Sequence, residues 1–336
     1  MNLTSPSQVK DWCIKNGFHP NRVLGQNFLI DRNALDAILD TALSFQSPDP
    51  PIPQSSNLNP QPSTLNPQHL NTPSVLEIGP GLGVLTEGLL SRGCAVTAIE
   101  KDPVLADRLK AALGDPDRLT VLKGDALDFI KQGACDGFPL MVSNLPYQAG
   151  TRILIELVER CASALPAPLN SQLSTLNSQP TSAEATVGKP ARQAPQPSTL
   201  NSQPSTAPEV IVVLVQTEVA ERLAAREGSK TRGLAGVRVQ FHYDVTIVRK
   251  VAASCFWPRP EIGSSIVKLV RHHRNDAVDA EVFRLFRHLT KQAFEHRRKQ
   301  LGSIFKGIIE STARAEELSN DDWLALSEAL DPDLFR

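Results

Sequence analysis

An amide, a peptide carbonyl and an aromatic ring lie close together in the stretch 142–147, whose sequence is Val-Ser-Asn-Leu-Pro-Tyr. The apolar residues before it predict a buried strand, and Pro146 fixes its own φ and biases Leu145 towards an extended backbone. The carbonyl oxygens of Asn144 and Leu145 could therefore accept the two N–H bonds of an exocyclic amino group such as that of adenine, while Tyr147 covers the base. Taken alone, the same residues could form an ordinary exit from a strand.

A second candidate site is the glycine-rich stretch that begins at Glu77. Gly79, Gly81 and Gly83 alternate with other residues directly after the apolar run 74–78 and before an expected helix. Glycines allow the backbone to approach a ligand closely, and a helix N-terminus favours negative charge. A single pattern of this kind is weak evidence for a nucleotide-binding loop.

Polar side chains at three successive strand ends strengthen that interpretation. Glu100 could bind both hydroxyls of a ribose, Asp125 could accept from an adenine amino group, and Asn144 ends the next strand. Together with the glycine loop they describe a slot shaped for a nucleoside. The glycine spacing lacks the G-x-G-x-x-G turn, which favours S-adenosylmethionine over a dinucleotide, and no Walker-type lysine follows, which argues against ATP.

Phe256 and Trp257 are a second aromatic candidate, followed closely by Pro258 and Pro260, which keep the segment extended. Phe256 could form the other side of a sandwich with Tyr147 and hold a flipped-out base between the two rings. Both aromatic residues could instead belong to the core at a bend. These residues alone do not separate the two interpretations.

The elements that must position these groups are strands alternating with helices. Strands are expected at 74–78, 95–99, 119–122, 140–143 and 210–215. Helices are expected at 8–16, 32–43, 84–92, 104–113, 151–162 and 216–225, with Asp31 and Asp102 as N-caps. The alternation predicts an α/β fold with a mostly parallel, doubly wound sheet, in which ligands bind at the carboxyl ends of the strands. Two later runs, at 243–251 and 265–270, predict an antiparallel pair that completes the sheet.

Two segments, 46–73 and 165–208, are rich in Pro, Ser, Asn and Gln and hold more than half of the 26 prolines. Both contain the run Ser-Thr-Leu-Asn, which begins at Ser63, Ser174 and Ser198. Such a composition buries too little apolar surface to offset its ordering entropy, so we expect disordered insertions, with docking tails for a partner as the alternative. Both precede an expected strand and therefore enter the sheet at the edge away from the ligand.

The tail from Ala280 is expected to be helical, with two different faces. One face carries Val282, Phe286, Leu289 and Ala293. The opposite face carries Arg284, Arg287, Lys291 and Arg298. Between residues 284 and 306 seven lysines and arginines accompany one glutamate, although the whole chain has a net charge of −1. A solvated face is the ordinary interpretation, but this segregation of charge favours contact with a phosphate backbone.

The composition is that of a globular protein, and 336 residues suffice for one large domain and a small one. The five cysteines form no C-x-x-C pair and have no metal-ligand spacing, which favours a reduced, cytoplasmic setting and no metal site. The longest apolar run, at 210–215, is too short to span a membrane, and the first ten residues show neither a signal nor a transit pattern.

Five stretches of the chain together resemble the ribosomal RNA adenine N6-dimethyltransferases of the KsgA type, and they occur in family order. They are Gly25-Gln26-Asn27-Phe28-Leu29, Glu77-Ile78-Gly79-Pro80-Gly81, Asn144-Leu145-Pro146-Tyr147, Phe256-Trp257-Pro258-Arg259-Pro260 and Ala293-Phe294-Glu295-His296-Arg297-Arg298-Lys299. The resemblance covers essentially all of the chain except the two insertions. The departures are those insertions and Trp257, where smaller residues or Tyr are more usual, and neither removes a motif residue.

The resemblance implies a Rossmann-like class I methyltransferase domain at 1–271 and a small all-helical RNA-binding domain at 277–336. It implies S-adenosylmethionine as the methyl donor, bound by Asn27, Leu29, Gly79, Gly81, Glu100, Asp125, Ala126 and Asn144. The catalytic set is then Asn144, Leu145, Tyr147 and Phe256. The expected RNA-binding set is Arg284, Arg287, Lys291, Arg297, Arg298 and Lys299.

The activity that the resemblance implies is dimethylation of two adjacent adenosines in a hairpin near the 3′ end of small-subunit (16S) rRNA, during ribosome biogenesis. The expected partner is the immature small ribosomal subunit, and the protein is expected to act as a cytoplasmic monomer without a membrane. We expect direct transfer, because acceptance of both adenine N–H bonds by Asn144 and Leu145 aims the nitrogen lone pair at the sulfonium methyl without a general base.

Three other functions are compatible with part of this pattern. The macrolide-resistance methyltransferases, which modify large-subunit rRNA, carry the same motifs, but Gly25 and the arginine-rich segment 293–299 favour the small-subunit branch. A DNA adenine methyltransferase is disfavoured because the chain has no target-recognition domain. A non-catalytic ribosome-assembly factor on the same fold is disfavoured by the intact Glu100, Asp125 and Asn144.

Overall fold

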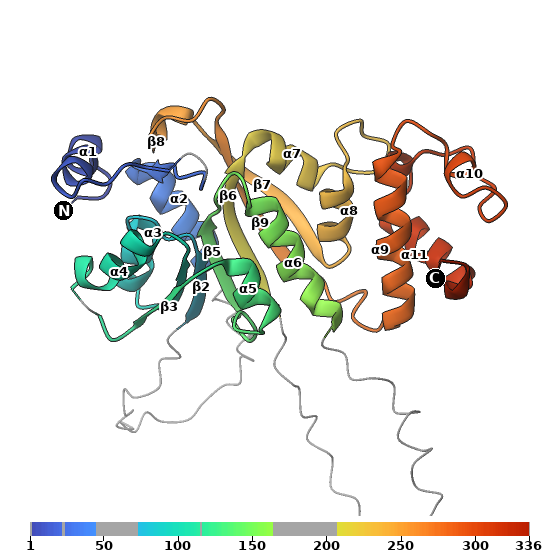
Figure 1. Cartoon of the computed structure of the whole chain (residues 1–336), viewed down its shortest axis with the longest axis horizontal. Helices are drawn as coiled ribbons and strands as arrows, with labels where there is room; N and C mark the ends of the chain where they lie inside the picture. The colour runs from blue at the N-terminus through green and yellow to red at the C-terminus, as the bar shows by residue number, and fades with distance from the viewer. Residues whose placement is uncertain (1, 22–23, 45–72, 115, 164–206, 336) are drawn as a thin grey trace, which may run out of the picture.

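The computed structural model describes residues 2–21, 24–44, 73–114, 116–163 and 207–335. A seven-stranded sheet in the order β4-β3-β2-β5-β6-β9-β7 lies at its centre (Figure 1). The strands are β2 (Ser74–Ile78), β3 (Ala95–Glu100), β4 (Leu119–Lys123), β5 (Leu140–Asn144), β6 (Val210–Gln216), β7 (Tyr243–Val251) and β9 (Ser264–Arg271). The two expected insertions lie almost wholly outside the described residues.

The sheet is mostly parallel, as the sequence predicts. All pairs among β4, β3, β2, β5 and β6 are parallel. β9 pairs antiparallel with both β6 and β7 and completes the sheet on that side. The expected α/β class and the antiparallel pair of late strands are therefore confirmed.

Helices cover both faces of the sheet. On one face lie α2 (Arg32–Leu43), α3 (Val84–Ser91) and α4 (Pro103–Ala112), and on the other lie α5 (Ala126–Lys131), α6 (Gly150–Ser163) and α7 (Thr217–Ala224). In β6, Val210, Val212 and Leu214 belong to the first core, whereas Ile211, Val213 and Val215 belong to the second. The unbroken apolar run of β6 is thus the pattern of a strand that is buried on both faces.

Aspartates begin three of these helices. Asp31 caps α2, Asp102 caps α4 and Asp125 caps α5. Each carboxylate accepts a backbone N–H of the first turn, at 2.8 Å for Asp31 and at 2.9 Å for the other two. The expected caps Asp31 and Asp102 are confirmed.

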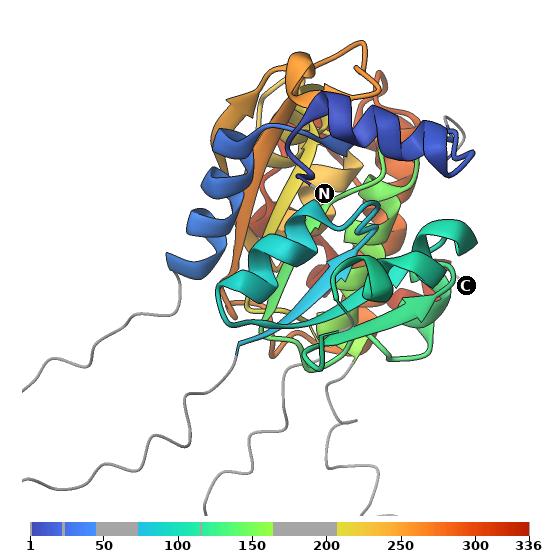
Figure 2. The ribbon, with the colours of Figure 1, turned by 90° about the vertical axis from the view of Figure 1, so that its left-hand side faces the viewer.

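A small two-stranded sheet joins the N-terminal segment to the segment between β7 and β9. β1 (Phe28–Leu29) pairs antiparallel with β8 (Phe256–Trp257), and the Ile30 N–H donates to the Cys255 carbonyl at 2.8 Å. The helix α1 (Pro6–Lys15) lies near this pair, at the edge where the parallel strands end (Figure 2). The sequence did not predict β1 or β8, because a strand of two residues has no recognisable alternation of apolar and polar positions.

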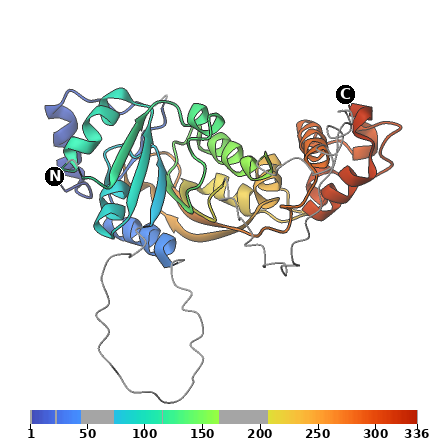
Figure 3. The same cartoon turned by 90° about the horizontal axis from the view of Figure 1, so that it is seen from below.

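The C-terminal helices form a third core, at the end of the sheet away from α3 and α4 (Figure 3). This core contains α9 (Ala280–Glu295), α10 (Leu301–Ile304) and α11 (Asn320–Ala329), packed around the buried Trp323 and Phe286. The helix α8 (Leu234–Gln240) precedes β7 yet supplies Val237 to the same core, and Phe241 follows it there. The domain boundary expected between 271 and 277 stays a prediction.

The apolar face of α9 differs in part from the expected one. Phe286, Leu289 and Ala293 are buried as expected, but Val282 is only half-buried, and Phe283 and Leu285 are buried as well. The buried surface is wider than one stripe because α9 packs against both α8 and α11. In the described part of the chain, no helix combines the length and the apolar character needed to cross a membrane.

Candidate active site

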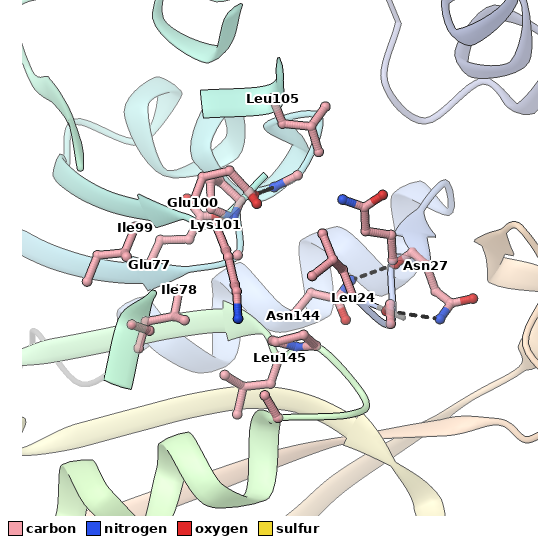
Figure 4. Close-up of a pocket in the computed structure, with 18 of the residues that line it drawn as sticks. Leu24, Asn27, Glu77, Ile78, Ile99, Glu100, Lys101, Leu105, Asn144 and Leu145 are labelled. Carbon is pink, nitrogen blue, oxygen red and sulfur yellow. Dashed lines mark hydrogen bonds between the residues drawn. The ribbon is translucent and has the colours of Figure 1, made fainter. Parts of the chain in front are cut away.

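A cavity lies where β2, β3, β4 and β5 end, at the edge of the sheet where the sequence predicts the ligand (Figure 4). Its lining includes all of the residues expected to hold the cofactor, namely Asn27, Leu29, Gly79, Gly81, Glu100, Asp125, Ala126 and Asn144. Of the expected catalytic residues, Asn144, Leu145 and Tyr147 line the cavity and Phe256 does not. The structure thus brings the predicted set together with one exception, and the role of each residue stays a prediction.

The side-chain amide of Asn144, the last residue of β5, is fixed by one contact. Its Nδ2 donates to the Asn27 carbonyl oxygen at 3.0 Å (Figure 4). Because a carbonyl can only accept, this contact determines which way the amide is turned and leaves Oδ1 as the second group. Oδ1 is buried, and none of the described residues donates to it. A buried acceptor without a donor costs about 1–3 kcal/mol, so Asn144 Oδ1 is a natural place for the N–H of a ligand.

The two residues that flank Pro146 supply another acceptor and a ring. Leu145 N–H donates to the Leu214 carbonyl at 3.2 Å, and no group in the described residues donates to the carbonyl of Leu145 itself. The Tyr147 hydroxyl lies 2.6 Å from Oγ of the buried Ser264, in β9. Burial is the main cause that raises the pKa of Tyr147, so the phenol stays neutral. Its ring is held at the far end by this hydrogen bond.

The glycine loop bends around the cavity. Gly79 and Gly81 have φ values of 71° and 58°, in the left-handed region that favours glycine. A Cβ at Gly81 would lie 3.0 Å from the ring of Phe28, so a side chain there would also crowd the N-terminal segment. The Gly81 N–H donates to a carboxylate oxygen of Glu100 at 3.0 Å, which ties the loop to the end of β3.

Glu100 keeps acceptor capacity for a ligand. One carboxylate oxygen accepts from Gly81 N–H at 3.0 Å and the other from Asp102 N–H at 2.9 Å. An ionised carboxylate offers about four acceptor positions, so both oxygens can still accept from ribose hydroxyls. Burial is the main cause that raises the pKa of Glu100, and these two backbone N–H groups oppose the rise.

Asp125 has partners on both oxygens. Oδ1 accepts from Leu127 N–H, and Oδ2 accepts from Lys101 Nζ at 2.8 Å. The hydrogen bond from Lys101 is the main cause that lowers the pKa of Asp125. An amino group of a ligand must therefore share an oxygen with Leu127 N–H or with Lys101. The sequence pattern did not single out Lys101, although its position directly after Glu100 places it at the end of β3.

Glu77 is a further carboxyl group in the wall of the cavity. It is 1% exposed, and its Oε2 accepts from Thr86 Oγ1 at 2.7 Å. Burial raises the pKa of Glu77 to about 8, and the nearby Glu100 carboxylate adds to the rise. Glu77 is therefore mostly protonated at neutral pH, which limits the negative charge of the cavity.

The N-terminal segment 24–29 closes one side of the cavity. Gln26 Nε2 donates to Asp102 Oδ2 at 2.9 Å, a contact that the sequence did not predict. Gly25 has a φ of 66°, and a Cβ there would lie 3.0 Å from the Tyr147 nitrogen. Only glycine therefore allows the segment to pass this close to the turn that carries Tyr147.

The sandwich expected between Tyr147 and Phe256 is not open in this structure. Phe256 is 2% exposed and pairs with Leu29 across the small sheet. The two rings meet edge to face, with centroids 6.5 Å apart and planes at 66°. A base held between two rings needs them roughly parallel, so one ring would have to turn. The sandwich stays a prediction.

Four of the expected RNA-binding residues point away from the protein. Lys291, Arg298 and Lys299 are exposed, and within the described chain none of them forms an ion pair. Arg284 is also exposed, and it pairs with Glu281 of the same helix at 3.4 Å. These side chains are available to phosphate groups.

The other two expected RNA-binding residues contact the protein itself. Nη2 of Arg287 lies 3.0 Å from a carboxylate oxygen of Glu159 in α6. Arg297 donates to the Lys230 carbonyl and lies 3.6 Å from the Glu316 carboxylate. The helical spacing that predicted a basic face therefore does not separate Arg287 from the exposed residues of that face. Arg297, expected from the resemblance, lies beyond the end of α9.

Comparisons with known proteins agree with this geometry. A family model described as ribosomal RNA adenine dimethylase matches residues 17–325. The ribosomal RNA small subunit methyltransferase A of Synechococcus sp. is 33% identical over 76% of this chain and 81% of its own length. The protein of the same name from Opitutus terrae is 30% identical over 91% of this chain and 85% of its own length.

Two solved structures have a similar fold. A dimethyladenosine transferase from Plasmodium falciparum has a TM-score of 0.57 at 20% identity, over 89% of this chain and 95% of the other. The 23S rRNA methyltransferase ErmE has a TM-score of 0.52 at 20% identity, over 90% and 98%. The sheet order, the glycine loop and these likenesses define a Rossmann-like class I methyltransferase fold.

Because the family model matches most of the chain, the protein belongs to the ribosomal RNA adenine dimethylase family. It is therefore a ribosomal RNA adenine methyltransferase whose donor is S-adenosylmethionine, which supplies an electrophilic methyl group when bound. The residues of the cavity fit this methyl donor, since Glu100 retains acceptor positions for ribose hydroxyls and the loop at Gly79 and Gly81 bends around the cavity without side chains. Within the described part of the chain, no group of His, Cys, Asp or Glu side chains could hold a metal ion.

Glu77→Gln should alter how stability depends on pH. The folded pKa of Glu77, about 8, lies above its ordinary value of 4.5, so between these values the folded protein holds a proton that the unfolded chain releases. The free energy of unfolding of the wild type therefore falls as pH rises through this window, by at most about 1.4 kcal/mol per pH unit. Gln stays neutral, so urea unfolding should show the variant gaining stability relative to wild type as pH rises. Parallel pH curves for the two proteins would contradict the assignment.

Tyr147→Phe and Ser264→Ala each remove one end of the hydrogen bond that holds the Tyr147 ring. We expect each to slow methyl transfer by roughly three- to tenfold, the equivalent of one net hydrogen bond. The double variant should be no slower, because both groups act through one contact. Initial rates at saturating donor measure the effect.

Ser265→Ala is the matched control for that experiment. Ser265 is as buried as Ser264, but its Oγ lies 3.2 Å from Thr217 Oγ1 and away from Tyr147. Its replacement should leave the rate unchanged. If the effects of Tyr147→Phe and Ser264→Ala multiply in the double variant, the contact is not what holds the ring.

Proposed function

We propose that the protein transfers methyl groups to N6 of two adjacent adenosines in a hairpin near the 3′ end of small-subunit (16S) rRNA. The curated relatives that span most of the chain are named ribosomal RNA small subunit methyltransferase A, which supports this target. The likeness to ErmE, at 20% identity, concerns the fold alone. The observation that carries the chemistry is the buried Asn144 Oδ1, to which no described residue donates.

The chain's residues align the substrate amine in this mechanism. The lone pair of adenine N6 is delocalised into the ring, so the amine is a weak nucleophile. Acceptance of its two N–H bonds by Asn144 Oδ1 and the Leu145 carbonyl favours a pyramidal nitrogen whose lone pair points at the methyl group. The nitrogen gains a positive charge on attack and then loses a proton to solvent, so no side chain has to act as a base. Tyr147 covers one face of the adenine.

The exposed cations of α9 and the segment that follows it would bind the RNA. Arg284, Lys291, Arg298 and Lys299 are placed to contact phosphate groups, which carry no sequence information and position the RNA. The partner in this proposal is the immature small ribosomal subunit, and the protein acts as a cytoplasmic monomer.

The target is tested by primer extension on rRNA from cells with and without the protein. An N6,N6-dimethyladenine cannot form its normal base pair and therefore stops reverse transcriptase. We expect stops at two adjacent adenines near the 3′ end of 16S rRNA only where the protein is present, and their restoration by purified protein with S-adenosylmethionine and immature subunits. Stops in 23S rRNA instead would support the macrolide-resistance activity. Donor binding without any stop would support an assembly factor.

Asn144→Ala should abolish methyl transfer while the fold persists. The variant loses the only side-chain acceptor in the proposed pair, so we expect the rate at saturating donor to fall by about a thousandfold, the upper range for one preorganised group. The variant also loses the Nδ2 hydrogen bond to the Asn27 carbonyl, so we expect the free energy of unfolding to fall by about 1 kcal/mol, the net contribution of one hydrogen bond. The control is Asn16→Ala, at the exposed residue that follows α1, because it also removes an amide that donates to a backbone carbonyl, that of Trp12. Near wild-type turnover of Asn144→Ala in a folded protein would refute the role.

A further inference from the structure

A buried ion-pair cluster joins α6, which packs on the central sheet, to the helices α8 and α9 of the third core. Glu159 of α6 is 6% exposed. One of its oxygens pairs with Arg238 of α8, and the other lies 3.0 Å from Nη2 of Arg287 on α9. Glu159, Arg238 and Arg287 are called the Glu159 clamp below. A carboxylate buried this deeply depends on its partners, because an unpaired buried charge is strongly destabilising.

Arg238 extends the clamp to the backbone of α9. Its Nη2 donates to the Arg287 carbonyl at 2.6 Å, and its Nε donates to Thr290 Oγ1 at 3.2 Å. A guanidinium is planar and carries five donors in a fixed arrangement, so several contacts from one arginine define direction as well as distance. α9 cannot slide or rotate against α6 without breaking some of these contacts.

The other end of α6 begins at the catalytic turn. The Gly150 N–H, at the first residue of the helix, donates to the Pro146 carbonyl at 2.7 Å. From Gly150 to Glu159 the helix spans about 14 Å at its usual rise per residue. α6 is therefore a continuous rigid element between the turn at Asn144–Tyr147 and the clamp.

Arg284 and Arg287 are a natural comparison, because they lie three residues apart on the same exposed side of α9. Their side chains are 53% and 48% exposed, so both are open to solvent. Arg284 pairs with Glu281 on its own helix, whereas Arg287 pairs with Glu159 on α6. The two arginines match in charge and exposure and differ in the element that carries their ion-pair partner.

We propose that the Glu159 clamp sets the position of α9 relative to the Asn144–Tyr147 turn, and that Arg287 is a positioning residue and not a phosphate contact. RNA bound to the exposed cations of α9 then presents its adenine at the cavity only while the ion pairs of the clamp are formed. This inference rests on the proposed function, because it assumes an RNA substrate that meets α9 and the cavity together.

The test compares Arg287→Met with Arg284→Met, which remove equal charge from neighbouring positions. For each variant, RNA binding is measured over a range of salt concentrations, and kcat and KM are measured on RNA that the wild type methylates. A lost phosphate contact lowers the slope of log affinity against log salt by about one. We expect that loss, together with a higher KM for RNA, for Arg284→Met. For Arg287→Met we expect the wild-type slope, an unchanged dissociation constant for the donor and at least a tenfold lower kcat.

A second readout does not depend on activity. Glu159→Gln, Arg287→Met and the double variant form a cycle whose urea unfolding midpoints should be non-additive, because the residues share one contact. Three results would contradict the proposal that the clamp positions the RNA. The first is that the shifts in unfolding midpoint of the two single variants add up in the double variant. The others are that Arg287→Met lowers the slope of log affinity against log salt as Arg284→Met does, or that its kcat equals that of the wild type. If the wild type methylates no RNA while the cycle is non-additive, the proposed function has failed and the clamp contact stands without a role in delivery of the base.

Discussion

One hydrogen bond, from the Asn144 amide to the Asn27 carbonyl, determines what the cavity can accept. It turns the amide so that its oxygen is left for a ligand, and it requires the N-terminal segment to stay beside the end of β5. The pairing of β1 with β8 and the contact from Gln26 to Asp102 keep that segment in place. The chemistry at the strand end therefore depends on residues from the start of the chain and from the far side of the sheet.

The sheet keeps its polar groups at one edge because both of its faces are covered. The strands β5 and β6 are mainly apolar up to their carboxyl ends, where Asn144 and Gln216 are only partly buried. Both expected insertions precede a strand, β2 in one case and β6 in the other, and so join the sheet at the opposite edge. This arrangement explains how the chain can carry such segments while every motif residue of the cavity stays in place.

Regular patterns made most of the fold predictable from the sequence. The strands at 74–78 and 243–251 and the helix capped by Asp31 have the expected bounds, because alternation and capping are local properties. The contacts that could not be predicted join residues far apart in the chain. The two-residue strands β1 and β8, the pairing of Lys101 with Asp125 and that of Arg287 with Glu159 have no local signature. The helical spacing of Arg287 predicted its exposure but not its partner.

The small sheet of β1 and β8 also bears on when the protein can become active during its own synthesis. Phe28 and Leu29 line the cavity, and their strand partner is made only after most of the chain has been translated. A nascent chain that ends before Phe256 lacks the strand that keeps this wall in place. The pocket for the methyl donor is therefore completed late in translation, after the strands β2, β3, β4 and β5 that carry its other walls.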